Sequence, residues 1–371
     1  MKEALRRHKD GEGLDFHSLN LTQSDMNYFS EFFSNHKKKI SSLDLSYNEI
    51  GLSGIQCLNS IFAYNSTLTT LNLANTQIGS DGISYLANVL EHNKTLESLN
   101  LSKSEVGEEG GIYLGEMLLH NTRLNVLNLS HNNIDSTGIS YIAMGLESNK
   151  ALKTLDLSYN NIGSAELEDL CIGLKFNQTL IELNLSGNII GSGGVSPLSS
   201  VIETSQTLTT LNLAENKLGD EGILHLTKGL VLNKTLRKCN LSENDIGDKG
   251  AKILGFVLEQ NTGLIYLDLS WNTIEVKGAR YLSEGLTRNS TLVLLDLAWN
   301  RICSKGARYL LNAIQREKAI CSIDTRWNSL DLADFKLFEC ASKRNRRKLE
   351  VIRSASVVTY PDLKSIAVAE W

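Results

Sequence analysis

Histidine, cysteine and carboxylate side chains occur along the chain, but not at the spacings that enzymes and metal sites need. The sequence has no HExxH, GxSxG or CxxC motif and no glycine-rich phosphate loop. Its six cysteines show no paired spacing, so a disulfide framework is not expected. His92 and His120 occupy the same place in two successive segments, and we expect them to be solvated rather than metal-bound. The sequence therefore predicts no catalytic residue, no metal site and no cofactor.

Tryptophan is the residue type whose spacing points to binding. Three of the four tryptophans stand 28 residues apart, each directly before an asparagine. Neighbouring strands lie about 5 Å apart, so one position of three successive strands would form a continuous aromatic strip. The expected partner-binding residues are these tryptophans and their neighbours on the same strands: Trp271, Trp299, Trp327, Tyr266, Asp268, Asp296 and Asp324. An exposed aromatic cluster predicts a protein-binding surface.

Two explanations that give these residues a purely structural role compete with this prediction. The position held by Asp268 is Asp or Asn in every copy of the pattern, which favours a structural polar ladder for the three aspartates. The indoles, in turn, could simply shield the end of the array by packing under residues 332–371.

A second charged pattern is expected on the opposite face. Basic residues repeat at two positions of three successive segments: Lys249, Lys277 and Lys305 at one, and Lys252, Arg280 and Arg308 at the other. Such a stripe can attract nucleic acid, an anionic membrane or an acidic partner. We expect no aromatic side chain to interleave it, and a solvated helix face is the favoured interpretation.

These residues owe their alignment to a 28-residue period that covers most of the chain. Copies of the pattern LxxLxL begin, without insertion or deletion, at Ile40, Leu68, Leu96, Leu124, Leu152, Leu180, Leu208, Leu236, Leu264, Leu292 and Ile320. A degenerate copy begins at Phe16. Internal repeats of this length indicate a solenoid in which stacked units share one core.

Each copy predicts a strand, a turn and a helix. Leucines alternate with polar residues in LxxLxL, as in a strand with one buried face. An asparagine follows the strand in most copies, and a stack of such side chains can satisfy the bent backbone. Thr76 and Ser104 replace it in two copies, where we expect a weaker ladder. A GxxG pair opens the helix, and a second asparagine ends it, which predicts a left-handed helix C-cap.

The ends of the array differ from its middle. We expect a capping region at residues 1–39 with an aromatic helix over 25–36, an array at 40–331, and a C-terminal cap and basic tail at 332–371. No secretory signal and no transmembrane segment are expected. These features predict a cytoplasmic protein, or a nuclear one if the basic run from Lys343 to Lys348 is a targeting signal.

The unit LxxLxLxxNxIGxxGxxxLxxxLxxNxT resembles the ribonuclease-inhibitor type of leucine-rich repeat, over residues 16–331. NOD-like receptors and Ran GTPase-activating proteins contain repeats of the same type. The chain departs from each: it has few cysteines, one repeat length, a basic rather than acidic tail, and no Walker motif. The resemblance implies an α/β horseshoe with a parallel sheet on the concave face and helices on the convex face.

The leading functional hypothesis is a non-enzymatic intracellular scaffold, adaptor or sensor in signalling or effector action. Its partner would be a protein bound on the concave C-terminal surface. The alternative is a regulator of an enzyme, either GTPase-activating or ribonuclease-inhibitor-like. One fold serves many partners, so the fold alone does not choose between them.

Overall fold

The computed structural model describes residues 5, 9, 11–36, 39–64, 66–316, 319–338, 340, 341 and 343. Its strands form one open parallel sheet in sequence order. They are β1 (Leu14–Asp15), β2 (Ser42–Asp44), β3 (Thr70–Asn72), β4 (Ser98–Asn100), β5 (Val126–Asn128), β6 (Thr154–Asp156), β7 (Glu182–Asn184), β8 (Thr210–Asn212), β9 (Lys238–Asn240), β10 (Tyr266–Asp268), β11 (Leu294–Asp296) and β12 (Ser322–Asp324). From β2 onward each residue pairs with the residue 28 positions later, so the sequence period is also the register of the sheet.

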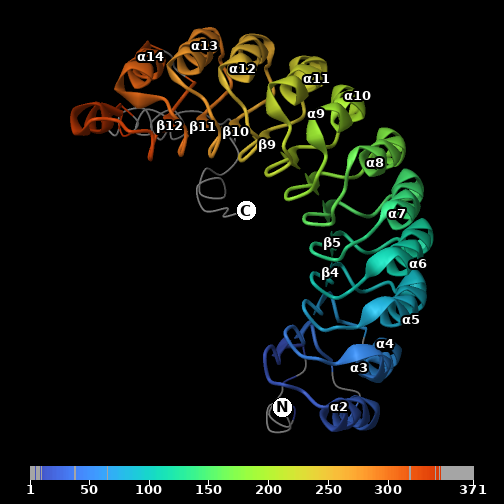
Figure 1. Ribbon diagram of the computed structural model, residues 1–371. Helices are drawn as coiled ribbons and strands as arrows, with labels where there is room; N and C mark the ends of the chain where they lie inside the picture. Colours follow the sequence, from blue (N-terminus) through green and yellow to red (C-terminus); the bar gives the residue numbers. More distant parts are fainter. Residues whose placement is uncertain are drawn as a thin grey trace, which may run out of the picture.

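The helices lie outside the sheet, and the described part of the chain curves into an arc (Figure 1). They are α2 (Gln23–His36), α3 (Gly51–Cys57), α4 (Asn59–Tyr64), α5 (Gly79–His92), α6 (Gly107–His120), α7 (Ser136–Ser148), α8 (Ser164–Phe176), α9 (Gly191–Gly194), α10 (Ser196–Thr204), α11 (Gly219–Leu232), α12 (Asp248–Gln260), α13 (Val276–Leu286) and α14 (Cys303–Arg316). Helices are wider than strands, so a sheet backed by helices bends with the strands on the concave side. The predicted α/β horseshoe is confirmed.

The core lies between the sheet and the helices and runs the length of the arc. Leu183 and Leu185 of the seventh strand segment are buried, and the leucines at the same positions of other copies are buried with them. Helices approach closely where a glycine replaces a side chain. A Cβ on Gly145 of α7 would come within 2.5 Å of the Gly115 carbonyl oxygen of α6.

The asparagine ladder satisfies the backbone where each strand ends. Asn160 donates from Nδ2 to the carbonyl oxygen of Leu129 in the preceding copy, at 2.9 Å. Its Oδ1 accepts from the backbone N–H groups of Asn132 and Ile134. Thr76 and Ser104 only donate, both to the Leu73 carbonyl oxygen. Their hydroxyls therefore replace only the donor half of the ladder.

The asparagines that end the helices do not adopt the predicted left-handed conformation. Asn233, for example, has φ −71° and ψ 138°, which is extended backbone. Its Nδ2 donates to the Ile202 carbonyl oxygen of the preceding copy, and its Oδ1 accepts from the N–H groups of Thr235 and Leu236. The residue is asparagine because both ends of its amide are used, and the conformational explanation was wrong.

Two different structures close the ends of the core. Phe29 and Phe33 of α2 form a buried aromatic cluster with Phe16, and the ring centroids of Phe29 and Phe33 lie 4.8 Å apart. At the other end a helix at 332–338 follows the last strand, and Phe338 is buried against the core. Among the helices within the described ranges, none is long and apolar enough to cross a membrane.

Candidate protein-binding surface

One column of side chains runs along the concave edge of the turn that follows each strand. It consists of the residue before each ladder position: Tyr47, Asn75, Lys103, His131, Tyr159, Gly187, Glu215, Glu243, Trp271, Trp299 and Trp327. We call it the turn column. All its members have left-handed backbone, with φ between 53° and 65°. This conformation is uncommon outside glycine, and it was not predicted from the sequence. The repeat turn thus fixes the backbone of a side chain whose identity is free to vary.

The C-terminal part of the turn column is a stack of three indoles, which we call the indole strip. Trp271 and Trp299 have ring centroids 4.2 Å apart with planes at 12°, and Trp299 and Trp327 lie 4.8 Å apart at 17°. The stacking follows from the fold, because neighbouring strands place identical positions at this distance. The three residues remain 50%, 40% and 67% exposed, respectively. The indoles therefore stack on one another while leaving a large apolar area in contact with solvent.

A row of carboxylates lies beside the indole strip, and its members are hydrogen-bonded unequally. Asp268 is buried and accepts from the Ser270 hydroxyl at 2.7 Å and from the Tyr266 hydroxyl at 2.9 Å. Asp324 pairs with the guanidinium of Arg326, at 2.6 Å between Oδ2 and Nη2. Asp268 and Asp324 therefore already have side-chain partners within their own copies of the repeat, as the explanation that gives these aspartates a structural role expects.

Asp296, between them, is different. Its Oδ1 accepts from the Ala298 backbone N–H at 2.8 Å, but alanine has no hydroxyl to add a second bond. Burial, together with the neighbouring charges of Asp268 and Asp324, raises the pKa of the Asp296 carboxyl to about 7. Asp296 is thus the carboxylate of the row that accepts the fewest hydrogen bonds.

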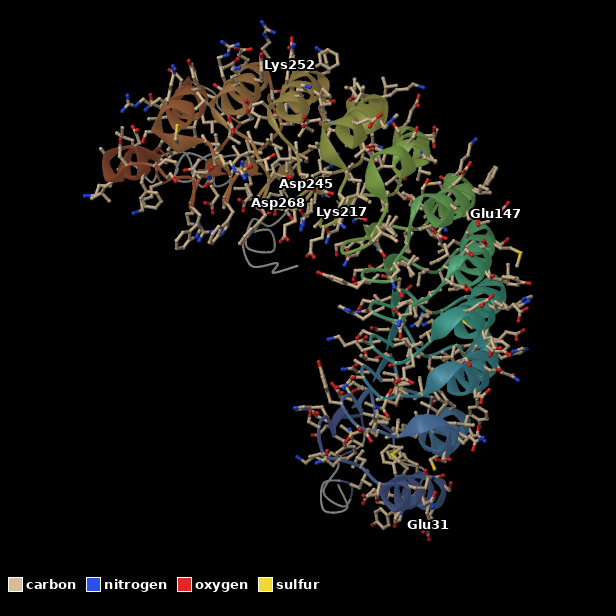
Figure 2. All side chains as sticks on the ribbon, viewed as in Figure 1. Glu31, Glu147, Lys217, Asp245, Lys252 and Asp268 are labelled. Carbon is tan, nitrogen blue, oxygen red and sulfur yellow. The ribbon has the colours of Figure 1, made fainter. Side chains whose placement is uncertain are left out.

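The row lies on the concave side. Figure 2 shows Asp268 there with Lys217 and Asp245, facing the interior of the arc.

The turn column contains a second cluster, which was not predicted from the sequence. His131 and Tyr159 are stacked with centroids 4.3 Å apart and planes at 4°. The Tyr159 hydroxyl reaches across Gly187 and donates to Oε1 of Glu215 at 2.7 Å. That bond, with burial, raises the pKa of Tyr159 to about 12. A Cβ on Gly187 would come within 2.3 Å of the tyrosine ring, so glycine is what lets the ring cross one copy of the repeat.

The basic stripe lies on the convex helices α12, α13 and α14, where all six side chains are exposed. Figure 2 shows Lys252 pointing outward from this side. Two members are paired: Arg280 with Glu284 at 3.4 Å and Arg308 with Asp334 at 3.3 Å. The expectation that no aromatic residue interleaves the stripe was wrong. The Tyr281 ring lies 5.6 Å from the Lys252 ammonium and 5.1 Å from the Arg280 guanidinium, because the residue after Arg280 turns toward α12.

The described residues contain no metal-binding cluster. No group of three histidine, cysteine or carboxylate side chains there is placed to hold a metal ion. Cys171 and Cys239 are buried in the core, and burial raises the pKa of each thiol to about 12. Such thiols are protonated at neutral pH and do not act as nucleophiles.

The basic run predicted as a targeting signal falls, from residue 344 onward, outside the described residues.

Comparison with known proteins identifies the repeat. The sequence profile described as "Leucine Rich repeat" matches residues 36–58, 64–87, 92–115, 120–143, 148–171, 176–199, 204–226, 232–255, 260–283 and 288–311. The chain belongs to the leucine-rich-repeat family. Leucine-rich repeats are generally interaction modules without enzymatic activity, so the family indicates a protein-interaction scaffold. The narrower resemblance to the ribonuclease-inhibitor type stays a prediction.

The solved structures that match this chain have low sequence identity to it. The match to "Leiomodin-1 Actin-Binding Site 2 (ABS2)" has 19% identity and a TM-score of 0.35, covering 39% of this chain and 88% of that one. The match to the tropomodulin C-terminal domain from Caenorhabditis elegans has 17% identity and a TM-score of 0.39, covering 44% and 99%. A TLR13–ssRNA13 complex matches at 19% identity and a TM-score of 0.44, covering 81% of this chain and 51% of that one. Among curated proteins, none matches the chain.

Proposed function

We propose that this leucine-rich-repeat protein is a non-enzymatic scaffold that binds a partner protein on the C-terminal quarter of its concave surface, through the indole strip. The observation that carries the proposal is the exposure of three consecutive stacked tryptophans on the same face. A contiguous exposed apolar patch is uncommon on a surface that binds nothing.

The energetics of the indole strip suit an interface. Tryptophan is the residue type most enriched among those that dominate binding energy. The indoles of Trp271 and Trp299 already hold each other in one orientation, so little side-chain entropy remains to be lost when a partner docks. Their left-handed backbone is set by the turn of each copy, which adds to the same preorganisation.

The described C-terminal helix leaves room for a partner. Phe338 and Ala341 of that segment are buried against the core, whereas Trp327 remains 67% exposed. This exposure supports partner binding over the explanation in which the indoles only shield the end of the array.

A pull-down with the purified, tagged 371-residue chain tests the proposal. The wild type, a variant with alanine at Trp271, Trp299 and Trp327, and a Tyr47→Ala control are compared. Tyr47 is a matched control because it lies in the same turn column, has φ 56° and is 55% exposed, but sits at the other end of the array. We expect a partner that the wild type and Tyr47→Ala retain equally and the triple variant loses. Equal retention by all three proteins would refute the proposed site.

A further inference from the structure

Asp296 differs from the other aspartates at its position of the repeat in what its second oxygen contacts. Asp44 accepts from the Ser46 hydroxyl at 2.6 Å and from Nδ2 of Asn72 at 2.8 Å. Asp156 accepts in the same way from the Ser158 hydroxyl and from Nδ2 of Asn184. In both cases an asparagine of the next copy supplies the missing donor. The polar ladder is complete at these two positions.

Two residue changes remove both donors at Asp296. Alanine at 298 replaces the serine that would supply a hydroxyl, and Asp324 replaces the asparagine that would supply an amide. The charged groups around the carboxylate are Asp268 on β10, and Asp324 and Arg326 at β12. Arg326 is engaged by both oxygens of Asp324 and lies one copy away. Asp296 therefore sits among like charges with an acceptor oxygen that no described residue satisfies.

The second carboxylate oxygen of Asp296 would be satisfied best by a positively charged group that donates hydrogen bonds in a fixed direction. A carboxylate that is half-buried between two others binds most strongly to a positive charge brought close to it. Arginine fits better than lysine, because its planar guanidinium donates two parallel hydrogen bonds to a carboxylate. Its aliphatic stem also packs well against apolar surface.

The indole strip supplies that apolar surface. Trp299 lies three residues beyond Asp296 on the same copy of the repeat, which places their backbones at most about 10 Å apart. Asp296 pairs in the sheet with Asp268, which faces the interior of the arc in Figure 2, and Trp299 stacks on Trp271 in the turn column. The backbone separation of Asp296 and Trp299 is short enough for one arginine side chain to contact both residues.

We propose that Asp296 anchors an arginine of the partner protein, with the arginine stem lying along the indole strip. This inference rests on the proposed function and adds the chemistry of the partner: a segment that presents a guanidinium to an anionic, aromatic surface. We choose a positively charged partner group because of charge complementarity. Among the described residues, one of the carboxylates Asp268, Asp296 and Asp324 is paired with a guanidinium, namely Asp324 with Arg326.

Synthetic peptides provide a direct test with the 371-residue chain. An acetylated glycine peptide carrying two arginines is compared with its isostere carrying two citrullines, which keep the shape and lose the charge. Binding is followed at pH 8 by calorimetry and indole fluorescence. We expect the arginine peptide to bind at least about tenfold more tightly, and the preference to disappear in Asp296→Asn. An Asp156→Asn control, at the same position of a distant copy, should keep the preference.

Proton release distinguishes the proposed contact from general electrostatic attraction. A guanidinium at Asp296 favours the ionised carboxylate, whose pKa in the free protein is about 7, so binding at pH 7 should release up to about half a proton per site from the wild type and none from Asp296→Asn. Calorimetry in two buffers of different ionisation enthalpy measures this directly. Absence of proton release, or an arginine preference that survives Asp296→Asn, would overturn the inference.

The remaining outcomes separate the inference from the proposed function. If arginine and citrulline peptides bind equally and both depend on Trp299, the arginine anchor is refuted and the indole strip stands. Failure of the arginine peptide to bind at millimolar concentration also refutes the anchor. A lysine peptide that binds as tightly as the arginine peptide would refute the guanidinium. If the indole emission of the free chain shifts to the red in high salt, the basic run of this same chain is the occupant, and the partner arginine is refuted.

Discussion

Replacing Asp296 by asparagine is expected to stabilise the C-terminal copies at pH 8 and to have much less effect at pH 4.5. The folded protein raises the pKa of this carboxyl from 3.8 to about 7, so the folded state holds a proton there that the unfolded state has lost. The stability linked to this proton is present below about pH 4 and is lost as the pH rises to about 7. Asparagine cannot ionise, so the variant avoids that loss.

The size of the effect follows from the shift and from the degree of burial. One pKa unit corresponds to about 1.4 kcal/mol, so the full shift would give at most about 4 kcal/mol. Asp296 keeps partial contact with solvent, and the screening that solvent provides reduces this to about 1–2 kcal/mol. The introduced amide also gains acceptors, because Asn72 and Asn184 donate to neighbouring aspartates from this same position.

Urea unfolding followed by circular dichroism at pH 4.5 and pH 8 measures the prediction. Asp156→Asn is the matched control with the opposite expected sign. Asp156 already accepts from Ser158 and Asn184, so an amide there would set one donor against another and destabilise at both pH values. A gain for Asp296→Asn that is equal at both pH values, or no gain at pH 8, would refute the reasoning.

Three further changes test the repeat itself. Asn160→Ala removes the side-chain partner of four buried backbone groups. The free energy of unfolding measured by urea titration should therefore fall by about 3 kcal/mol or more. A fall below about 1 kcal/mol would contradict the ladder. Gly187→Ala should displace the Tyr159 ring and break its bond to Glu215, which a difference titration at 295 nm would show as a tyrosine whose pKa falls from about 12 toward 10; an unchanged titration would contradict the close contact. Deleting residues 124–151 should leave a shorter folded arc, whereas deleting 124–137 should unfold its neighbourhood, as judged by circular dichroism and limited proteolysis; equal tolerance would contradict a solenoid.

The repeat explains why so much of the fold could be predicted from the sequence. Leucine alternation and a constant 28-residue period determine which side chains are buried and which positions become neighbours. Trp271 and Trp299 could therefore be placed side by side from their numbers alone, and the structure stacks them at 4.2 Å. The ladder role of residues such as Asn160 could also be predicted, because an amide has both a donor and an acceptor.

Contacts that depend on side-chain direction or on a missing group could not be predicted in this way. The bond between Tyr159 and Glu215 spans two copies and needs the empty space at Gly187. The shortage of donors at Asp296 becomes visible only when Ala298 and Asp324 are seen to replace the usual partners. The role of Asn233 was misassigned because its side chain satisfies the adjoining backbone groups while its own backbone stays extended.

The measurement that tests the central claim most directly is the paired effect of Trp299→Ala on stability and on binding. An exposed side chain usually changes the free energy of unfolding by about 0.5 kcal/mol or less, whereas a dominant interface tryptophan contributes about 2 kcal/mol or more to binding. We predict a nearly unchanged melting temperature and a dissociation constant for the partner that rises at least about thirtyfold, with Tyr47→Ala changing neither. Loss of the C-terminal copies on heating, with partner affinity unchanged, would show that the indole strip holds the array together and does not bind the partner.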